Sequence, residues 1–268
     1  MMKLSWIATS AIACMLALAL EVIAFAGWFR PRVPGIAPIV QAQVEKASEA
    51  ISAATVQTQA AASEASVASR HEDGYYAQLR TKVRWVETRI GADKLLTPDD
   101  SSRVLLAKSA AERARLHDVG LSFKDVYGII NAETSWIPRL GSSKDGTPNL
   151  GLAQFEPATA RALGLRNPND AVEAIHVAAL HMKEAAEWSA NRIAGLKLGD
   201  GERALKLREG VSIFYNLSTK GRNRWNGTNT AKLPIETQLH IRNARTGAQF
   251  AAELDARQAP SGFMLTGG

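Results

Sequence analysis

Cysteine, histidine pairs and aromatic residues are all scarce in this sequence. Cys14 is the only cysteine among 268 residues, which excludes a disulfide framework and a cysteine-based metal site. The histidines form no HExxH pair, and His176 and His181 lie five residues apart, a spacing that does not place them on one helical face. We therefore expect no metal and no cofactor. Aromatic residues make up only 6% of the chain, while alanine is frequent, and both features favour helix over sheet.

Long runs of alternating apolar and polar residues are also missing, which excludes a substantial sheet. The chain is 46% hydrophobic, enough for one domain of ordinary size with appendages. Residues 191–245 carry eleven Lys and Arg against four Asp and Glu, a surplus of seven. Such a surplus favours an anionic partner, namely nucleic acid, lipid headgroups or an acidic glycan, unless it is only a solvated helical face. The fold class predicted is mostly α.

The chain begins with an apolar segment and a spacer. Residues 4–29 are apolar apart from a few Ser and Thr and one Glu21, and the run is long enough to span a bilayer. Residues 1–29 are therefore predicted to be an uncleaved signal anchor, or a signal peptide cleaved after small residues. Both alternatives place the rest of the chain on the periplasmic side of an inner membrane. Residues 30–71, with prolines and then an Ala/Ser-rich low-complexity stretch, are predicted to be a spacer.

Apolar spacing predicts the helices that follow. The extension 72–118 contains one apolar stripe at steps of three or four, made by Tyr76, Leu79, Val83, Val86 and Ile90. A second helix is predicted to start at 97–100. Residues 122–125 are expected to cap the next helix, because a cap serine with an acid three residues later satisfies free amides. Residues 167–170 are expected to open another, with the proline at its first position. A further stripe runs over 204–214, and 251–268 is predicted to be a loose tail.

Glu133 is the residue whose placement calls for a chemical explanation. It directly follows the helical spacing of Val126, Ile129 and Ile130, and Trp136 comes three residues later. A carboxyl group at the buried end of a helix is poorly solvated. Poor solvation raises the pKa of such a group, which can then act as a general acid near neutral pH. The alternative is a glutamate that caps a helix or forms an ion pair.

Four more short blocks follow Glu133 in the sequence. The five blocks are Glu133-Thr134-Ser135-Trp136-Ile137-Pro138, Gly151-Leu152-Ala153-Gln154-Phe155, Pro157-Ala158-Thr159-Ala160-Arg161-Ala162-Leu163-Gly164, Phe214-Tyr215-Asn216 and Leu233-Pro234-Ile235-Glu236-Thr237. In this order they resemble the lytic transglycosylases of the SLT type, which are similar in fold to goose-type lysozyme. The resemblance covers about residues 120–245, and five ordered blocks are more specific than any one motif. It implies a lysozyme-like α-helical catalytic domain over 119–250.

The resemblance also implies an activity and a set of site residues. The implied reaction is cleavage of the β-1,4 bond between N-acetylmuramic acid and N-acetylglucosamine in peptidoglycan, with closure of a 1,6-anhydro ring. Glu133 would serve first as general acid and then as base. The implied substrate-binding residues are Ser142, Ser143, Gly151, Gln154, Phe155, Tyr215, Asn216 and His240. Tyr215 also fits an ordinary rim or core aromatic residue beside Phe214.

Departures from the family pattern leave alternatives open. Ala153 replaces a methionine and shortens a side chain expected near the substrate, Ala171 replaces an asparagine, and His240 stands where a tyrosine is expected. One alternative is a lysozyme-type hydrolase in which Asp145 or another acid of the loop positions a water. The other is a non-catalytic peptidoglycan-binding scaffold of an envelope-spanning machine. The expected partners are glycan strands, the membrane through the N-terminal segment, and a secretion or conjugation machine, but no nucleic acid.

Overall fold

The structure is a computed structural model that describes residues 57, 74–143 and 145–258. The chain divides into two units, residues 1–74 and 75–268, and all the described residues except 57 and 74 belong to the second. The predicted signal segment, 1–29, lies outside the described residues, as does almost all of the spacer 30–71. Within the described ranges, no helix is both long and apolar enough to cross a membrane.

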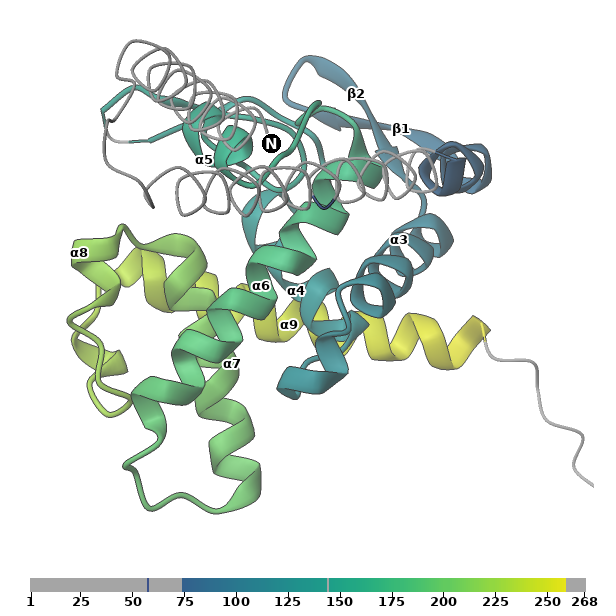
Figure 1. The fold of residues 1–268 in the computed structure, drawn as a ribbon. Helices are drawn as coiled ribbons and strands as arrows, with labels where there is room; N and C mark the ends of the chain where they lie inside the picture. The colour runs from purple at the N-terminus through teal and green to yellow at the C-terminus, as the bar shows by residue number, and fades with distance from the viewer. Residues whose placement is uncertain (1–56, 58–73, 144, 259–268) are drawn as a thin grey trace, which may run out of the picture. The chain divides into compact units, whose positions relative to one another are not determined.

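The second unit is mostly helical, which confirms the predicted fold class at that level (Figure 1). Residues 75–82 are helical. After them come, in chain order, β1 (Trp85–Ile90), β2 (Asp93–Pro98), α3 (Asp100–Arg113), η1 (Leu116–Val119), α4 (Phe123–Thr134), β3 (Gly141–Ser142), β4 (Pro148–Asn149), α5 (Pro157–Ala162), α6 (Ala171–Ile193), α7 (Asp200–Asn216), α8 (Thr219–Arg222), η2 (Thr230–Lys232) and α9 (Ile235–Gln258). The four strands form two separate antiparallel hairpins.

The predicted helical stripe over 76–90 is wrong beyond residue 82. The helix ends at residue 82, and β1 pairs with β2 in a register that places Trp85 opposite Pro98. Val86 and Ile90, expected in the core, are 44% and 38% exposed on this hairpin. β-Branched residues favour strands, and Gly91 takes a left-handed φ of 61° in the two-residue turn between them. Turn chemistry and strand propensity therefore outweigh the helical spacing here.

Helix starts follow local capping chemistry. The side chain of Asp99 caps α3 by accepting a hydrogen bond from the Ser102 amide, in agreement with the predicted start. Ser122 and Asp125 form the predicted capping box at α4. The start of α6 differs from the prediction, because Asp170 is the cap and Pro168 lies before the helix. The Asp170 carboxylate accepts hydrogen bonds from the backbone amides of Val172 and Glu173. These amides lie in the first turn, where the helix itself offers them no acceptor.

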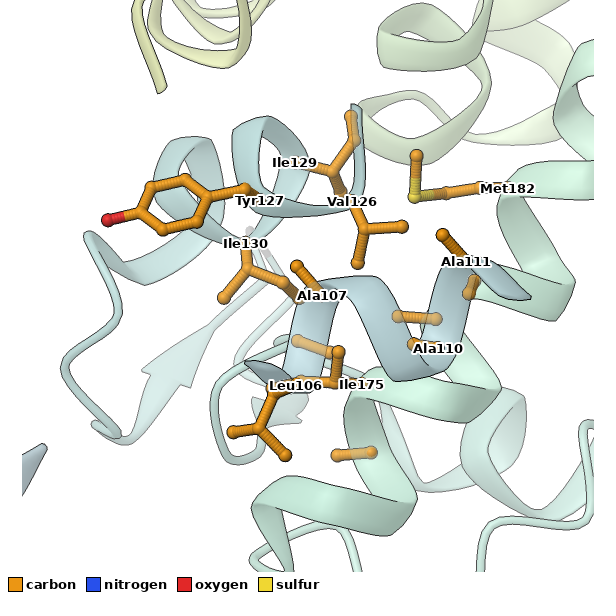
Figure 2. Close-up of a cluster of buried hydrophobic side chains, with 14 of the residues drawn as sticks. Leu106, Ala107, Ala110, Ala111, Val126, Tyr127, Ile129, Ile130, Ile175 and Met182 are labelled. Carbon is orange, nitrogen blue, oxygen red and sulfur yellow. The ribbon is translucent and has the colours of Figure 1, made fainter. Parts of the chain in front are cut away.

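The core lies between α3, α4 and α6, as Figure 2 shows. Helix α3 contributes mainly alanines to it, which lets α4 approach closely, while α4 and α6 supply larger apolar side chains. Complete burial of one such large side chain stabilises a fold by about 1.5–3 kcal/mol. The labelled members are Leu106, Ala107, Ala110, Ala111, Val126, Tyr127, Ile129, Ile130, Ile175 and Met182.

Helices α4 and α9 make the most extensive helix contact in the described unit. Glycines allow it: a Cβ at Gly128 would lie 2.3 Å from the Ala244 carbonyl oxygen, and one at Gly247 would lie 2.6 Å from the Cβ of Asn131. The Asn131 side-chain amide also donates to the Asn243 carbonyl across the same contact. This close approach brings the first turns of α9 beside the end of α4.

Replacing Gly128 with alanine is expected to push α9 away from α4. The added methyl group meets backbone atoms, which cannot rotate aside, so the free energy of unfolding should fall by about 1–3 kcal/mol. Urea unfolding measures this loss. Gly201→Ala in α7 is the matched control, because a Cβ there meets nothing within 4 Å. Equal stability of the two variants would contradict the close approach of α4 and α9.

The predicted loose tail is wrong for residues 251–258. Helix α9 continues through Gln258, and Ala251 and Leu254 are buried against the core. The apolar spacing of these two residues continues the buried face of α9, so the helix gains contacts by extending. Residues 259–268 lie outside the described part of the chain.

Candidate active site

Glu133 lies in the last turn of α4, and an unusual turn ends the helix beyond it. Ser135 and Trp136 both adopt left-handed backbone conformations, with φ of 54° and 64°. Two such residues in succession reverse the chain and fold Trp136 back onto α4. Trp136 is completely buried, and its indole N–H donates to the Tyr127 carbonyl at 3.3 Å. The position of Glu133 is therefore fixed by a packed aromatic anchor.

Three further hydrogen bonds hold the end of α4. The Thr97 hydroxyl, at the end of β2, donates to the Trp136 carbonyl at 2.5 Å. The Thr134 hydroxyl lies 3.0 Å from the carbonyl oxygen of Leu152, which ties α4 to the second motif block. Arg139 donates from Nη2 to the carbonyl oxygen of Glu133 at 3.1 Å. The two side-chain donors from outside the helix, Thr97 and Arg139, thus bind the backbone of Trp136 and of Glu133 itself.

The loop 150–155 depends on two residues with left-handed backbone. Gly151 has a φ of 68°, and a Cβ on it would lie 2.0 Å from the Pro168 carbonyl oxygen, so only glycine fits. Gln154 has a φ of 51°, and its side-chain amide donates to the carbonyls of Arg139 and Gly151, each at 2.8 Å. In the structure Gln154 therefore braces the loop, and its predicted contact with a sugar stays a prediction.

The two predicted serines lie in the hairpin before this loop. Ser142 is exposed in β3, and the Ser143 hydroxyl donates to the carboxylate of Glu156 at 2.5 Å. Asp145, the acid considered for a hydrolase, is exposed and accepts a hydrogen bond from the Thr147 amide. That bond lowers the pKa of Asp145 and keeps its carboxylate in the turn of its own hairpin. Substrate contacts of the serines stay predictions.

His240 contacts Glu133 directly. The Nε2 atom of His240, in the second turn of α9, lies 2.8 Å from Oε1 of Glu133. The two side chains are 5% and 16% exposed, so the pair is largely shielded from water. One turn earlier on α9, the Thr237 hydroxyl donates to the side-chain oxygen of Asn216 at 2.8 Å. The predicted site residues Glu133 and His240, 107 positions apart, are thus brought together by the α4–α9 contact.

Tyr215 lies close to the same carboxylate. Burial, and to a smaller extent the negative charge of Glu133, raises the pKa of Tyr215 well above its ordinary value. Its hydroxyl lies 3.5 Å from the Ala153 carbonyl, and its ring packs on Phe155 with centroids 6.0 Å apart. The phenol therefore keeps its proton across the physiological range. Tyr215 provides a neutral hydroxyl donor within the electrostatic reach of Glu133.

Ala153 is completely buried, and the expected closeness of position 153 to a substrate stays a prediction. The loss of methionine length at this position therefore affects packing beneath the loop 150–155. Phe155 is also buried, at 3% exposure, and supports Tyr215 from inside. Ala153 and Phe155 thus support the site from the protein interior, beneath its surface.

The sequence reasoning missed His181, which lies behind Tyr215 on α6. Its ring is 5.4 Å from the Tyr215 ring and 5.2 Å from the Phe214 ring, and its Nδ1 is 3.2 Å from a Glu184 carboxylate oxygen. Burial lowers the pKa of His181, against the opposing effect of Glu184, and Arg222 lowers it further. Of these partners, only Glu184 lies on α6 at a helical spacing, and the others come from α7 and α8, so no sequence pattern indicated the burial of His181.

Acid is expected to destabilise the fold through His181. The pKa in the folded chain lies below that of the unfolded chain, about 6.5, so the unfolded state binds more protons as the pH falls. The free energy of unfolding should therefore be fully maintained above about pH 6.5 and decrease below it, by at most about 1.4 kcal/mol per pH unit. Urea unfolding between neutral and mildly acidic pH measures the slope. His181→Gln should flatten it, whereas His117→Gln, at an exposed histidine, should not; an unchanged slope in His181→Gln would refute the assignment.

A separate hollow of about 280 Å³ lies between α4, α7 and α9. Its lining includes Asp125 and Ile129 of α4, Val211 of α7 and Ala248 of α9. None of the predicted site residues lines it. In the described ranges, no three His, Cys, Asp or Glu side chains are grouped to hold a metal ion. The candidate active site is therefore defined by Glu133 and its neighbours.

A comparison of the chain with protein-family models, curated proteins and solved structures gave no match in any of the three.

Proposed function

We propose that the chain is a peptidoglycan lytic transglycosylase with a lysozyme-like catalytic domain over 119–250. The observation that carries the proposal is the meeting of distant motif blocks around Glu133. Thr134 contacts the carbonyl of Leu152, Tyr215 contacts that of Ala153, and the Asn216 side chain is bound by Thr237. These contacts join four of the five family-like blocks. The remaining block, 157–164, contains α5.

Glu133 performs both proton transfers in the proposed reaction. The protonated carboxyl donates its proton to the glycosidic oxygen as the bond from that oxygen to the muramyl C1 breaks, and the substrate's own N-acetyl group supports the positive charge at C1. The resulting carboxylate then removes the proton of the C6 hydroxyl while O6 bonds to C1. The products are a 1,6-anhydro end and a free hydroxyl on the leaving sugar, and no water is consumed. Glu133 regains its proton, which completes the cycle.

The surroundings of Glu133 suit such a group. It is 16% exposed, so one side of the carboxyl is open while the other contacts His240. Tyr215 remains a neutral phenol because burial raises its pKa, and it can donate a hydrogen bond to the carboxylate or to the sugar N-acetyl group. These features fit one carboxyl that gives and takes back a proton in a partly dry site.

Two other functions receive less support. A hydrolase would need a second carboxylate to activate water, and Asp145 is exposed and engaged with the Thr147 amide of its own hairpin. A scaffold that only binds glycan has no use for a shielded carboxyl paired with a histidine. Burial of such polar groups costs stability, so their presence is better explained by a catalytic function that needs them. The pair formed by Glu133 and His240 therefore favours an enzyme.

The location and partners belong to the same proposal. Residues 1–29 would anchor the protein in the inner membrane or direct it across, and 30–71 would let the catalytic domain reach the wall from the periplasmic side. Local opening of peptidoglycan is a step that secretion and conjugation machines require, which makes such a machine the expected partner.

Incubation of the purified full chain with peptidoglycan sacculi tests the proposal. The expected result is soluble muropeptides that accumulate with time and enzyme concentration, with heat-denatured protein as the control. Tight binding to sacculi without any release would contradict enzymatic activity and favour the scaffold function.

A further inference from the structure

One buried atom beside Glu133 has no hydrogen-bond partner. The Nδ1 atom of His240 is buried, and it is the only buried side-chain nitrogen or oxygen in the described residues that lacks a partner. The other ring nitrogen, Nε2, is 2.8 Å from Oε1 of Glu133. The imidazole ring therefore has a hydrogen-bond partner at only one of its two nitrogens. The free energy of placing the ring proton consequently differs between Nδ1 and Nε2.

The proton position on His240 follows from this difference. Either neutral tautomer leaves one unpaired buried group at Nδ1, an N–H donor or a lone pair, at a cost of about 1–3 kcal/mol, so the contact at Nε2 decides between the tautomers. An imidazolium would bear the same unsatisfied Nδ1–H together with a charge in a shielded site. A proton on Nε2 donates to Oε1 of Glu133 whether the carboxyl group is ionised or carries its own proton on Oε2, whereas an unprotonated Nε2 would place its lone pair against that of an ionised Oε1. The ring is thus held as the neutral tautomer with its proton on Nε2.

The two carboxyl oxygens of Glu133 are distinguished by the same contact. Oε1 accepts from His240, whereas Oε2 has no hydrogen-bond partner among the described residues. Oε2 is also not among the buried atoms without a partner, so it is open to solvent. A proton on Oε2 leaves Oε1 free to accept from His240, and removal of that proton places part of the negative charge on Oε1, which strengthens the same hydrogen bond.

We propose that His240 is a positioning residue that reserves Oε1 of Glu133 by donating to it from Nε2, so that Oε2 carries the catalytic proton in both steps. This inference rests on the proposed function and deepens it. Oε2 donates its proton to the glycosidic oxygen and later accepts the proton of the C6 hydroxyl, while His240 keeps its own proton throughout. The ring contacts the acid and does not contact the sugar.

Two variants of His240 separate this role from simple packing. His240→Phe keeps a buried ring without a donor, and His240→Tyr supplies a hydroxyl donor. On sacculi, kcat of the phenylalanine variant should fall roughly 10- to 100-fold with KM little changed, because a hydrogen bond to a charged group is lost. The tyrosine variant should retain most of kcat. A phenylalanine variant that keeps the wild-type kcat would overturn the proposal.

Nitrogen-15 NMR of the full chain with labelled histidine reads the proton position directly. The resonances of His240 are identified by their absence in His240→Tyr. The expected spectrum shows a proton bonded to Nε2 and an unprotonated Nδ1 at neutral pH. A proton on Nδ1, or on both nitrogens, would overturn the proposal even if His240→Phe does not fold. If the wild type releases no sugar, the proposed function fails, whereas the NMR result still decides the arrangement of the pair.

Discussion

Replacing Glu133 with glutamine is expected to reduce the release of sugars from peptidoglycan to background. The amide keeps the shape of the side chain and its acceptor oxygen for His240, but it cannot donate a proton and then take it back. General acid–base catalysis contributes roughly 10²–10⁴-fold, and here one residue serves both steps. The rate of soluble muropeptide release from sacculi measures the effect.

The fold of this variant should survive, because the substitution leaves no cavity and removes a shielded acid. Circular dichroism and urea unfolding check that point. Glu187→Gln is the matched control, since Glu187 is exposed on α6 and lies outside the site. Its activity should equal that of the wild type. A Glu133→Gln protein that releases sugars at the wild-type rate would remove Glu133 from the chemistry.

Replacing Trp136 with alanine is expected to cause the largest loss of stability. The indole is completely buried, it packs on Tyr127 with ring centroids 4.8 Å apart, and its N–H binds a carbonyl of α4. Loss of a buried tryptophan side chain costs about 3–5 kcal/mol. Urea unfolding should show the lower free energy.

Trp85→Ala is the control for this substitution, because Trp85 is 44% exposed on β1 and should cost far less. Activity of Trp136→Ala should also fall at temperatures where the protein stays folded, since the turn that places Glu133 loses its anchor. Equal costs for the two substitutions would show that Trp136 does not organise the end of α4.

Helix positions could be predicted where the signal is local. The capping box of Ser122 and Asp125 involves residues three positions apart, and the apolar spacing of α4 and α7 is periodic within each helix. The β1–β2 hairpin was missed because Val86 and Ile90 also fit a helical period, and the decisive turn at Gly91 occupies only two residues. Local chemistry therefore predicts helix starts better than it distinguishes short strands.

The candidate site could be predicted only as a set of residues. The position of Glu133 beside His240 depends on two glycines, Gly128 and Gly247, whose effect appears only when α4 and α9 pack together. The bracing role of Gln154 likewise depends on carbonyls of Arg139 and Gly151, which no spacing rule relates to it. Contacts between distant segments set these arrangements, and a single sequence does not display them.

The mass of the glycan product tests the central claim most directly. Full-length protein is incubated with purified sacculi, and the released muropeptides are analysed by mass spectrometry without chemical reduction. We expect ends of 1,6-anhydro-N-acetylmuramic acid, lighter by one water than the product of a lysozyme, because the attacking hydroxyl belongs to the sugar itself. Reducing N-acetylmuramic acid ends as the main product would mean that water attacks, and would contradict the transglycosylase mechanism.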